Sequence, residues 1–326
     1  MRYIKTSVVM ATYNGHDYVE EQLLSILRQT MPVSEVLIFD DCSNDDTREI
    51  CQSFITRNKL TEWKLFCNKV NKGYVKNFYD GFKKATGDII FIADQDDIWL
   101  ENKVERIVEI FEKYTGALSI VSAYSRFYED VVYSKHLRVP NGVVNSIAEI
   151  SLSSFCSFYG YLGMCTAFKK QLISFGYDVV LKHLTYDVAI NFLAALHKGF
   201  YYVDEVLVNR RTYASVSNKE SAETVINGYG GDIKLFSISR DVKNLTSMSE
   251  VAKQLGLIDK IRIIDNYRKL SQLRLDYLKS CNICECLSLS YRVFCLKTWK
   301  TMLGDIIYVL RKLMKKHYSK FYQVHK

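Results

Sequence analysis

The sequence has no apolar run of roughly eighteen residues or more, the length that a membrane-spanning helix requires. The nearest candidate, residues 186–208, is interrupted by polar and charged side chains such as Asp187, Asn191 and Lys198. The apolar run close to the N-terminus is too short for a signal peptide, and nothing after it reads as a cleavage site. We therefore predict that the protein has no transmembrane helix and stays in the cytoplasm.

Several common motifs are also missing. The nine cysteines form no repeating framework, which favours reduced thiols. The spacing of Cys281, Cys284, Cys286 and Cys295 matches no standard zinc site. The spacings GxGxxG and GxxxxGK[ST], which cradle phosphates in dinucleotide-binding proteins and P-loop NTPases, do not occur. These absences argue against a structural zinc site and against those two classes of nucleotide-binding protein.

The first part of the chain alternates continuous apolar runs with helical spacing. The runs at residues 7–12, 35–40, 63–67 and 88–94 are typical of strands buried on both faces of a parallel sheet. Helical stripes lie between them, and Ser43 with Asp46 has the spacing of a capping box at the start of the second helix. This order predicts an α/β fold with a Rossmann-like, mostly parallel central sheet flanked by helices.

From about residue 221 onward the sequence has helical spacing. We predict a domain over residues 1–220 and a helical region over residues 221–326 that ends in a basic amphipathic helix. From Lys297 to the end there are eight Lys or Arg and one acid, so this segment carries +7 of the net charge of +8. The final helix could lie on an anionic membrane with Trp299, Tyr308 and Tyr318 at the interface. It could instead pack on the core, or bind a partner helix. The charge is local and no recognition module is evident, so we expect no nucleic-acid partner.

Polar loops follow all four predicted strands, and the carboxyl ends of such strands meet at one edge of the sheet. The loop after the fourth strand reads DQDD, with carboxylates at residues 94, 96 and 97. Like charges this close are costly unless a cation lies among them. Asp94 and Asp96 are therefore candidates to hold Mg²⁺ or Mn²⁺, which would bridge to a diphosphate. Asp40 and Asp41 end the neighbouring strand, and a carboxylate there can accept the imide N–H of uracil or thymine.

The stretches SVVMATYNG, LIFDDCSNDDT, NKGYVKNFYDGFKKATGDIIFIADQDDIW and YDVAINFLAALHKGFYYVDEVLVNRR together resemble an inverting family 2 glycosyltransferase of the GT-A fold. The resemblance covers residues 5 to about 217 in order and spacing. The DQDDIW variant is similar to the bacterial branch that includes many rhamnosyltransferases of surface polysaccharide synthesis.

The resemblance implies roles for individual residues. Ala11, Thr12 and Tyr13 would line the base and ribose of the nucleotide, and Asp41 would hold the pyrimidine with support from Asp40. Lys76 falls where the family often has a contact to the nucleotide. Asp94 and Asp96 correspond to the DxD pair, with Asp96 the stronger metal candidate, and Asp187 corresponds to the general base.

One position departs from the family pattern. Many relatives place a histidine near the metal or diphosphate where this chain has Thr212. We expect Arg210 or Arg211 to take over part of the diphosphate charge, since a guanidinium can bind phosphate through two bonds.

The resemblance implies transfer of a sugar, from dTDP-rhamnose or a UDP-hexose, to a lipid-linked glycan at the inner face of the cell membrane. A non-catalytic scaffold subunit that keeps the nucleotide pocket is the alternative, and Asp94, Asp96 and Asp187 argue against it. A sugar nucleotidyltransferase would show a glycine-rich, basic N-terminal loop, which MATYNGHDYVEEQ does not supply. The sugar, the acceptor and any association between copies of the chain stay open.

Overall fold

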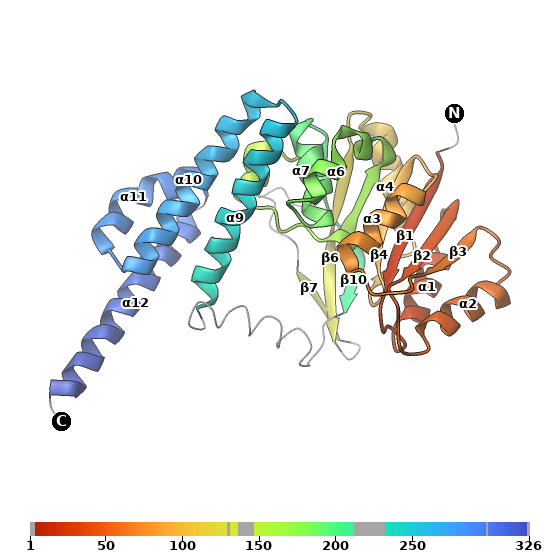
Figure 1. The fold of residues 1–326 in the computed structure, drawn as a ribbon, viewed down its shortest axis with the longest axis horizontal. Coiled ribbons are helices and arrows are strands. Elements are labelled where there is room, and N and C mark those ends of the chain that lie inside the picture. Colours follow the sequence, from red (N-terminus) through yellow and green to blue (C-terminus); the bar gives the residue numbers. More distant parts are fainter. Residues whose placement is uncertain (1–3, 129–130, 136–146, 212–231, 298, 325–326) are drawn as a thin grey trace. The chain divides into compact units, whose positions relative to one another are not determined.

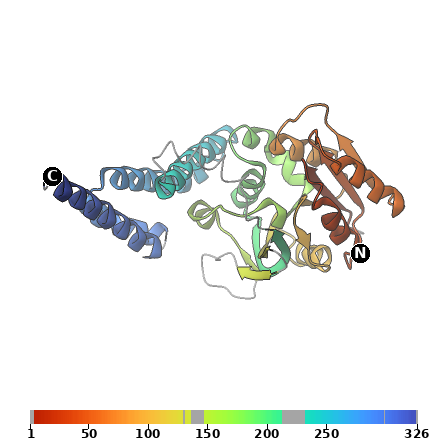
Figure 2. The ribbon, with the colours of Figure 1, turned by 90° about the horizontal axis from the view of Figure 1, so that it is seen from below.

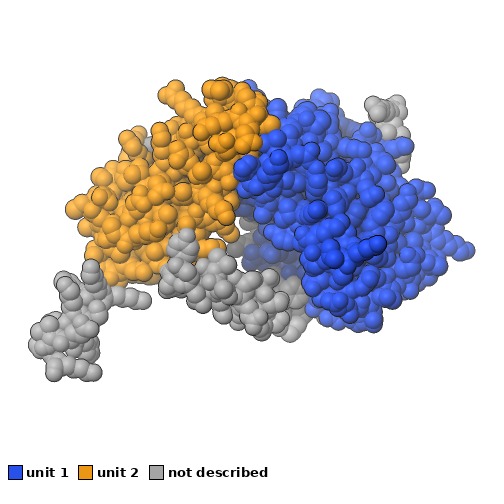
Figure 3. Space-filling model, viewed as in Figure 1, with its two compact units in different colours: residues 1–214 blue, residues 215–326 orange. Residues whose placement is uncertain are grey.

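A computed structural model describes residues 4–324, apart from residues 129–130, 136–146, 212–231 and 298. The chain divides into two compact units, residues 1–214 and 215–326 (Figure 3). The boundary predicted between residues 220 and 221, and Thr212, lie outside the described residues.

The first unit is built on a central sheet whose first half is parallel, as predicted. Four strands follow the order β3-β2-β1-β4 and pair in parallel. Their bounds are Thr6–Thr12 for β1, Glu35–Asp40 for β2, Trp63–Cys67 for β3 and Ile89–Asp94 for β4. Every residue of β2 is buried, which explains why its sequence is apolar without alternation.

The second half of the sheet is mixed. Strand β9 (Thr166–Lys169) lies between β4 and β6 (Ser119–Tyr128) and is antiparallel to both. Strand β10 (Phe200–Arg211) is parallel to β6 and antiparallel to β5 (Ile98–Trp99). Two short strands pair at this side, β7 (Val131–Lys135) with β6 and β8 (Ile147–Glu149) with β10. The pairing of β10 with β5 brings the end of β10 to the DQDD loop.

Helices flank the sheet (Figures 1 and 2). Those of the first unit are α1 (Val19–Leu27), α2 (Thr47–Arg57), α3 (Tyr74–Lys84), α4 (Lys103–Lys113), α5 (Leu152–Ser157), α6 (Tyr177–Leu181) and α7 (Tyr186–Leu196), with 3₁₀ turns at Gly163–Cys165 and Lys170–Phe175. Helix α1 packs on α2, and α3 packs against β1, β2 and α7. The predicted capping box at Ser43 is wrong, because α2 begins at Thr47 and the Ser43 hydroxyl donates to Asp40 instead.

The second unit is helical, as predicted. It comprises α9 (Ile233–Gln254), α10 (Ile258–Ser280), α11 (Ile283–Leu296) and α12 (Trp299–Val324). Its apolar core includes Ile238, Leu278 and Val309, from three of these helices. Beside this core, Asp305 accepts hydrogen bonds from Arg274 at 2.8 Å and Tyr277 at 2.6 Å. Among the described residues, no helix is both long and apolar enough to cross a membrane.

Candidate active site

The register of the parallel strands brings the predicted loops together. Thr12 at the end of β1 lies opposite Asp40 at the end of β2, and Ala11 lies opposite Asp94 at the end of β4. The loops after these strands therefore meet at the carboxyl edge of the sheet, as the sequence predicts.

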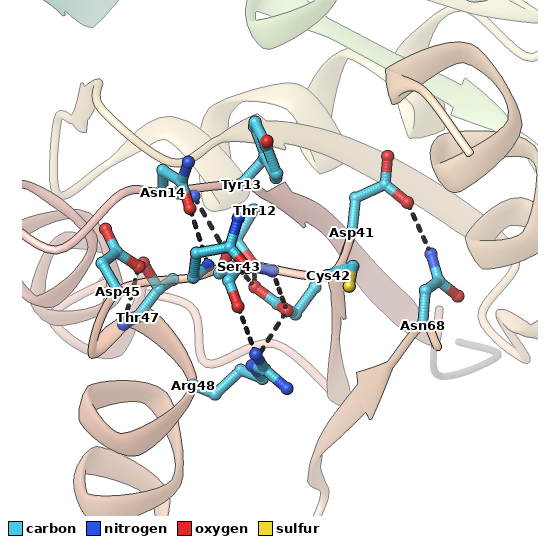
Figure 4. Close-up of polar contacts among 12 residues, drawn as sticks. Thr12, Tyr13, Asn14, Asp41, Cys42, Ser43, Asp45, Thr47, Arg48 and Asn68 are labelled. Atoms are coloured by element: carbon cyan, nitrogen blue, oxygen red, sulfur yellow. Dashed lines mark hydrogen bonds and ion pairs between the residues drawn. The ribbon is translucent and has the colours of Figure 1, made fainter. Parts of the chain in front are cut away.

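Asp40 joins the ends of β1 and β2 to the start of α2. Its carboxylate is fully buried and accepts from the Thr12 hydroxyl at 3.1 Å and from the backbone N–H of Ser43 at 3.0 Å. Arg48 of α2 lies 3.4 Å from the same carboxylate (Figure 4). Asp40 thus shapes the first two loops.

Asp41 fixes the loop that follows β3. Its side chain accepts from the backbone N–H groups of Lys72 and Gly73, each at 2.8 Å, and from the Asn68 amide at 2.9 Å. In Figure 4 it points to Asn68, away from Arg48. Gly73 has a positive φ of 80°, a conformation that favours glycine and places its N–H against the carboxylate. Asp41 is only 3% exposed. A nucleotide base that reached its carboxylate would therefore also lie within hydrogen-bonding distance of this loop.

Gln95, which we did not single out from the sequence, clamps the first loop to the acidic loop. Its side-chain oxygen accepts from the Tyr13 N–H at 2.8 Å, and its amide nitrogen donates to the Tyr13 carbonyl at 3.0 Å. A Cβ added at Gly15 would lie 2.3 Å from the Gln95 side-chain oxygen, so a larger residue there would displace the Gln95 side chain. The clamp leaves the Tyr13 side chain exposed, in position to contact a ligand.

The carboxylates of the acidic loop oppose one another's charge. Burial, and then the charges of Asp96 and Asp187, raise the pKa of Asp94 to about 7. Asp97 is 3% exposed and accepts from the Arg211 backbone N–H at 3.2 Å. Burial, then the charges of Asp94 and Asp96, raise its pKa well above the usual value. The loop therefore holds negative charge that its surroundings only partly offset.

Two cations partly offset this charge. The positive charge of Arg210 favours the ionised forms of Asp94 and Asp97. Lys103 is completely buried; its ammonium donates to the Met164 carbonyl at 2.7 Å and lies 3.6 Å from the centre of the Trp99 ring. Burial lowers the pKa of Lys103 to about 7, although the negative charges of neighbouring acids act to raise it. No sequence pattern identified this lysine, which lies at the start of an amphipathic helix.

Arg211 has a structural position. Its guanidinium pairs with Glu21 and stacks over the rings of Tyr18 at 4.8 Å and Phe127 at 4.5 Å. It also donates to the Asp96 carbonyl at 3.1 Å, so it holds the acidic loop to α1 and β10. Of the two predicted arginines, Arg210 is therefore the better candidate for contact with a diphosphate.

Asp187 lies in the first turn of α7, near the acidic loop. Its Oδ1 accepts from the Val188 N–H at 2.8 Å and the Thr185 hydroxyl at 2.7 Å. Burial raises the pKa of Asp187 by more than these bonds lower it. Because both bonds are to Oδ1, Oδ2 is the oxygen that can take up a proton. The charge of Asp187 acts on Asp94, so the predicted base and the predicted metal ligand share one site.

The residues present fit a divalent cation bound together with a ligand. The raised pKa of Asp94 reflects burial and then the charges of nearby carboxylates, and a bound cation would offset both effects. No three acidic, histidine or cysteine side chains converge as a closed metal site in the described part of the chain. An open site, with one or two carboxylates and the remaining positions filled by phosphate and water, is the arrangement typical of Mg²⁺.

Lys76 lies in the first turn of α3. It lines a cavity beside the first turn of α3 whose wall contains none of Ala11, Thr12, Tyr13 or Asp41.

Sequence comparison places the chain in a known family. Residues 7–174, more than half of the chain, match the family described as glycosyl transferase family 2. A dTDP-rhamnosyl transferase of Shigella flexneri, RfbG, is 36% identical over 121 residues, which are 35% of this chain and 42% of that protein. Alignments with this and two other curated relatives span only 33% to 48% of their lengths.

Solved structures with the same fold support the match. S. aureus TarS 1-349 in complex with UDP has a TM-score of 0.55 at 18% identity, with 82% of this chain and 90% of that chain covered. The mannosyltransferase PcManGT from Pyrobaculum calidifontis, in complex with GDP-Man and Mn²⁺, has a TM-score of 0.54 at 14% identity, with 98% and 89% covered. The mixed sheet flanked by helices is thus the GT-A fold predicted from the sequence, and the chain belongs to glycosyl transferase family 2.

Proposed function

We propose that this protein is an inverting glycosyltransferase that moves a sugar from a UDP or dTDP donor to a glycan acceptor in surface polysaccharide synthesis. The observation that carries the proposal is the convergence of Asp187, Asp94 and Arg210 at the edge where β1, β2 and β4 end. The names of two similar proteins, a dTDP-rhamnosyl transferase and a UDP complex, support these two donor nucleotides. A non-catalytic scaffold is not favoured, because it has no need of opposed carboxylates.

The nucleotide would lie along the carboxyl edge of the sheet. Tyr13 offers an exposed ring beside the base, and Asp41 offers a carboxylate that can accept the imide N–H of uracil or thymine. Asp40 and Gln95 hold the two loops that carry these contacts. Arg210 would face the diphosphate, whose charge it can partly neutralise.

Asp187 would act as the general base. In an inverting transfer the acceptor hydroxyl attacks the anomeric carbon, the bond from that carbon to the diphosphate breaks, and the hydroxyl proton goes to Asp187 Oδ2. A raised pKa makes this carboxylate a stronger proton acceptor than an exposed aspartate. Asp96 and Asp94 would hold Mg²⁺ or Mn²⁺, which when bound supplies positive charge to the leaving diphosphate.

Calorimetric titration of UDP and dTDP, each with and without Mn²⁺, tests the proposal. We expect metal-dependent binding of one nucleotide to the wild-type chain and its loss in Asp96→Ala. Asp259→Ala is the matched control, because it removes an exposed carboxylate from the helical unit. Failure of both nucleotides to bind under every condition would refute the proposal.

We also propose that the enzyme works at the inner face of the cell membrane on a lipid-linked acceptor. Leu303, Ile307, Leu310 and Met314 of α12 follow one another at helical spacing, and each is at least 40% exposed. The surrounding segment is basic, which complements an anionic lipid surface. The prediction that Tyr308 lies at the membrane interface is wrong, because its hydroxyl donates to Asp232 and its ring packs beside the core.

Sedimentation with vesicles tests the membrane proposal. The chain should pellet with phosphatidylglycerol vesicles and stay in solution with phosphatidylcholine vesicles at the same salt concentration. Leu310→Gln with Met314→Gln should abolish pelleting. Equal recovery of wild type and variant in the supernatant would contradict the proposal.

A further inference from the structure

A cavity lies beside the first turn of α3, and of the residues expected to hold the donor only Lys76 lines it. Its volume is about 640 Å³, and it is lined by residues of α3, of the loop before α3, and of α6 with the residue after it. The wall includes the apolar side chains of Val75 and Leu181 and the ring of Tyr74. A space of this size can hold a small charged group with part of an apolar or sugar moiety attached.

The wall of this cavity is positively charged. It contains three lysines, Lys72, Lys76 and Lys182, and one acid, Asp178. Lys72 pairs with Asp80 at 3.0 Å, and Asp178 accepts from the Tyr79 hydroxyl. Lys76 and Lys182 are exposed and form no ion pair with any residue that the structure describes. Lys76 and Lys182 therefore give the cavity wall a net positive charge, which Asp178 offsets only in part.

The backbone adds further donors for an anion. Helix α3 begins at Tyr74, and the N–H groups of a first helical turn have no partner within the helix. The Gly73 N–H, one residue earlier, is already bound to Asp41 on the donor side. The N–H groups that follow belong to residues of the cavity wall, where the helix dipole also favours negative charge.

The cavity is next to the predicted general base. Tyr74 lines it, and the Tyr74 ring contacts the ring of Tyr186 edge to face, with centroids 5.9 Å apart. Asp187 is the neighbour of Tyr186 in α7, and after burial its charge is the other influence that raises the pKa of Tyr74. A molecule whose hydroxyl reached Asp187 could therefore extend past Tyr74 into the cavity.

From this arrangement we infer that the cavity binds the phosphate or diphosphate group of the acceptor, with Lys76 and Lys182 as its cationic ligands. The inference rests on the proposed transferase function and specifies the acceptor as a phosphate-bearing glycan. It also assigns Lys76 to the acceptor, where the family resemblance implied a nucleotide contact. The phosphate can come from a lipid diphosphate carrier or from a phosphate on the glycan itself.

Binding of small probes to the full chain tests this inference. Inorganic pyrophosphate, geranyl diphosphate and geraniol are titrated by calorimetry in EDTA, so that no cation draws the probes to the acidic loop. The variants are Lys182→Gln and Lys76→Gln with Lys182→Gln. The matched control is Lys59→Gln with Lys64→Gln, which removes two exposed lysines that lie outside the cavity wall.

We expect both diphosphates to bind the wild-type chain and geraniol not to bind. Lys182→Gln should weaken diphosphate binding about fivefold and the double variant by about tenfold or more, as expected for charge-assisted bonds at an exposed site. The control should bind as the wild type does. Tighter binding of geranyl diphosphate than of pyrophosphate identifies a lipid diphosphate as the source, and equal binding identifies a glycan phosphate.

Three results would overturn the inference: no diphosphate binding, unchanged binding in the double variant, or an equal loss in the control. Titrations of UDP and dTDP with Mn²⁺ on the same preparations separate the two proposals. Donor binding without diphosphate binding rejects only the acceptor site, whereas diphosphate binding without donor binding rejects only the transferase.

Discussion

Replacement of Gln95 by alanine should weaken donor binding without unfolding the protein. The side chain makes two hydrogen bonds to the Tyr13 backbone, at 2.8 and 3.0 Å, and these join the first loop to the acidic loop. A hydrogen bond of this kind contributes about 0.5–1.5 kcal/mol net, and partial exposure favours the lower half of that range. Loss of both should cost about 1–2 kcal/mol, which corresponds to a dissociation constant roughly 5- to 30-fold higher for the nucleotide.

The assay is calorimetric titration of the nucleotide that binds the wild-type chain, with circular dichroism to verify folding. Gln95→Glu sharpens the test, because it keeps the acceptor for the Tyr13 N–H but places an oxygen opposite the Tyr13 carbonyl. Gln52→Ala is the matched control, since the Gln52 side chain is exposed on α2 and bonds only weakly to Thr56, at 3.4 Å. Wild-type affinity in Gln95→Ala, or the same loss in Gln52→Ala, would refute the reasoning.

Three further predictions follow from the site and from the helical unit. Asp187→Asn should abolish transfer, and the wild-type rate should fall as acidification protonates Asp187, at a higher pH than an ordinary aspartate would show; a pH–rate profile that stays level to about pH 4 contradicts this. Arg210→Ala should weaken donor binding in titrations, whereas Arg211→Ala should mainly lower the melting temperature. The opposite pair of results would mean that the two arginines have exchanged roles. Asp305→Asn leaves Arg274 buried without its counter-charge and should destabilise the helical unit by about 3–5 kcal/mol, seen as faster hydrogen exchange in α10 and α12. Burial alone would raise the pKa of Asp305, but the hydrogen bonds it accepts, led by that from Arg274, lower it. The ionised Asp305 therefore stabilises the helical unit above the unfolded pKa, and this stabilisation is lost as pH falls through the lowered folded pKa. Hydrogen-exchange protection that stays unchanged in acid would contradict this.

The parallel half of the sheet was predictable because its strands are buried on both faces. Continuous apolar runs at residues 35–40 and 63–67 coincide with β2 and β3, and the other two runs differ from β1 and β4 by one residue at one end. Strand β9 was not predicted. It has four residues and its place between β4 and β6 depends on pairing partners far along the chain, which no local pattern encodes.

The candidate site was predictable only in part, for a similar reason. Loops after parallel strands must converge, so the proximity of Asp40, Asp41 and Asp94 follows from the strand order. The clamp by Gln95 depends on a contact 82 residues away, and the burial of Lys103 depends on a carbonyl 61 residues away. Contacts between residues this far apart in the sequence cannot be recognised from residue spacing or amphipathicity. Asp187 was identified from family resemblance alone.

The carboxylates that shape the site can be told from the carboxylates available to a ligand by the groups that surround each of them. Asp41 receives hydrogen bonds from N–H donors on both of its oxygens, and these bonds hold the loops. Burial opposes the ionisation of both Asp94 and Asp187, and like charge opposes that of Asp94 as well, so the pKa values of both are raised. A carboxylate whose ionised form is disfavoured by the surrounding protein gains the most stabilisation when it binds a cation or a proton. The metal and the acceptor proton should therefore be taken up on the side of Asp94 and Asp187, while Asp40 and Asp41 determine which nucleotide fits beside them.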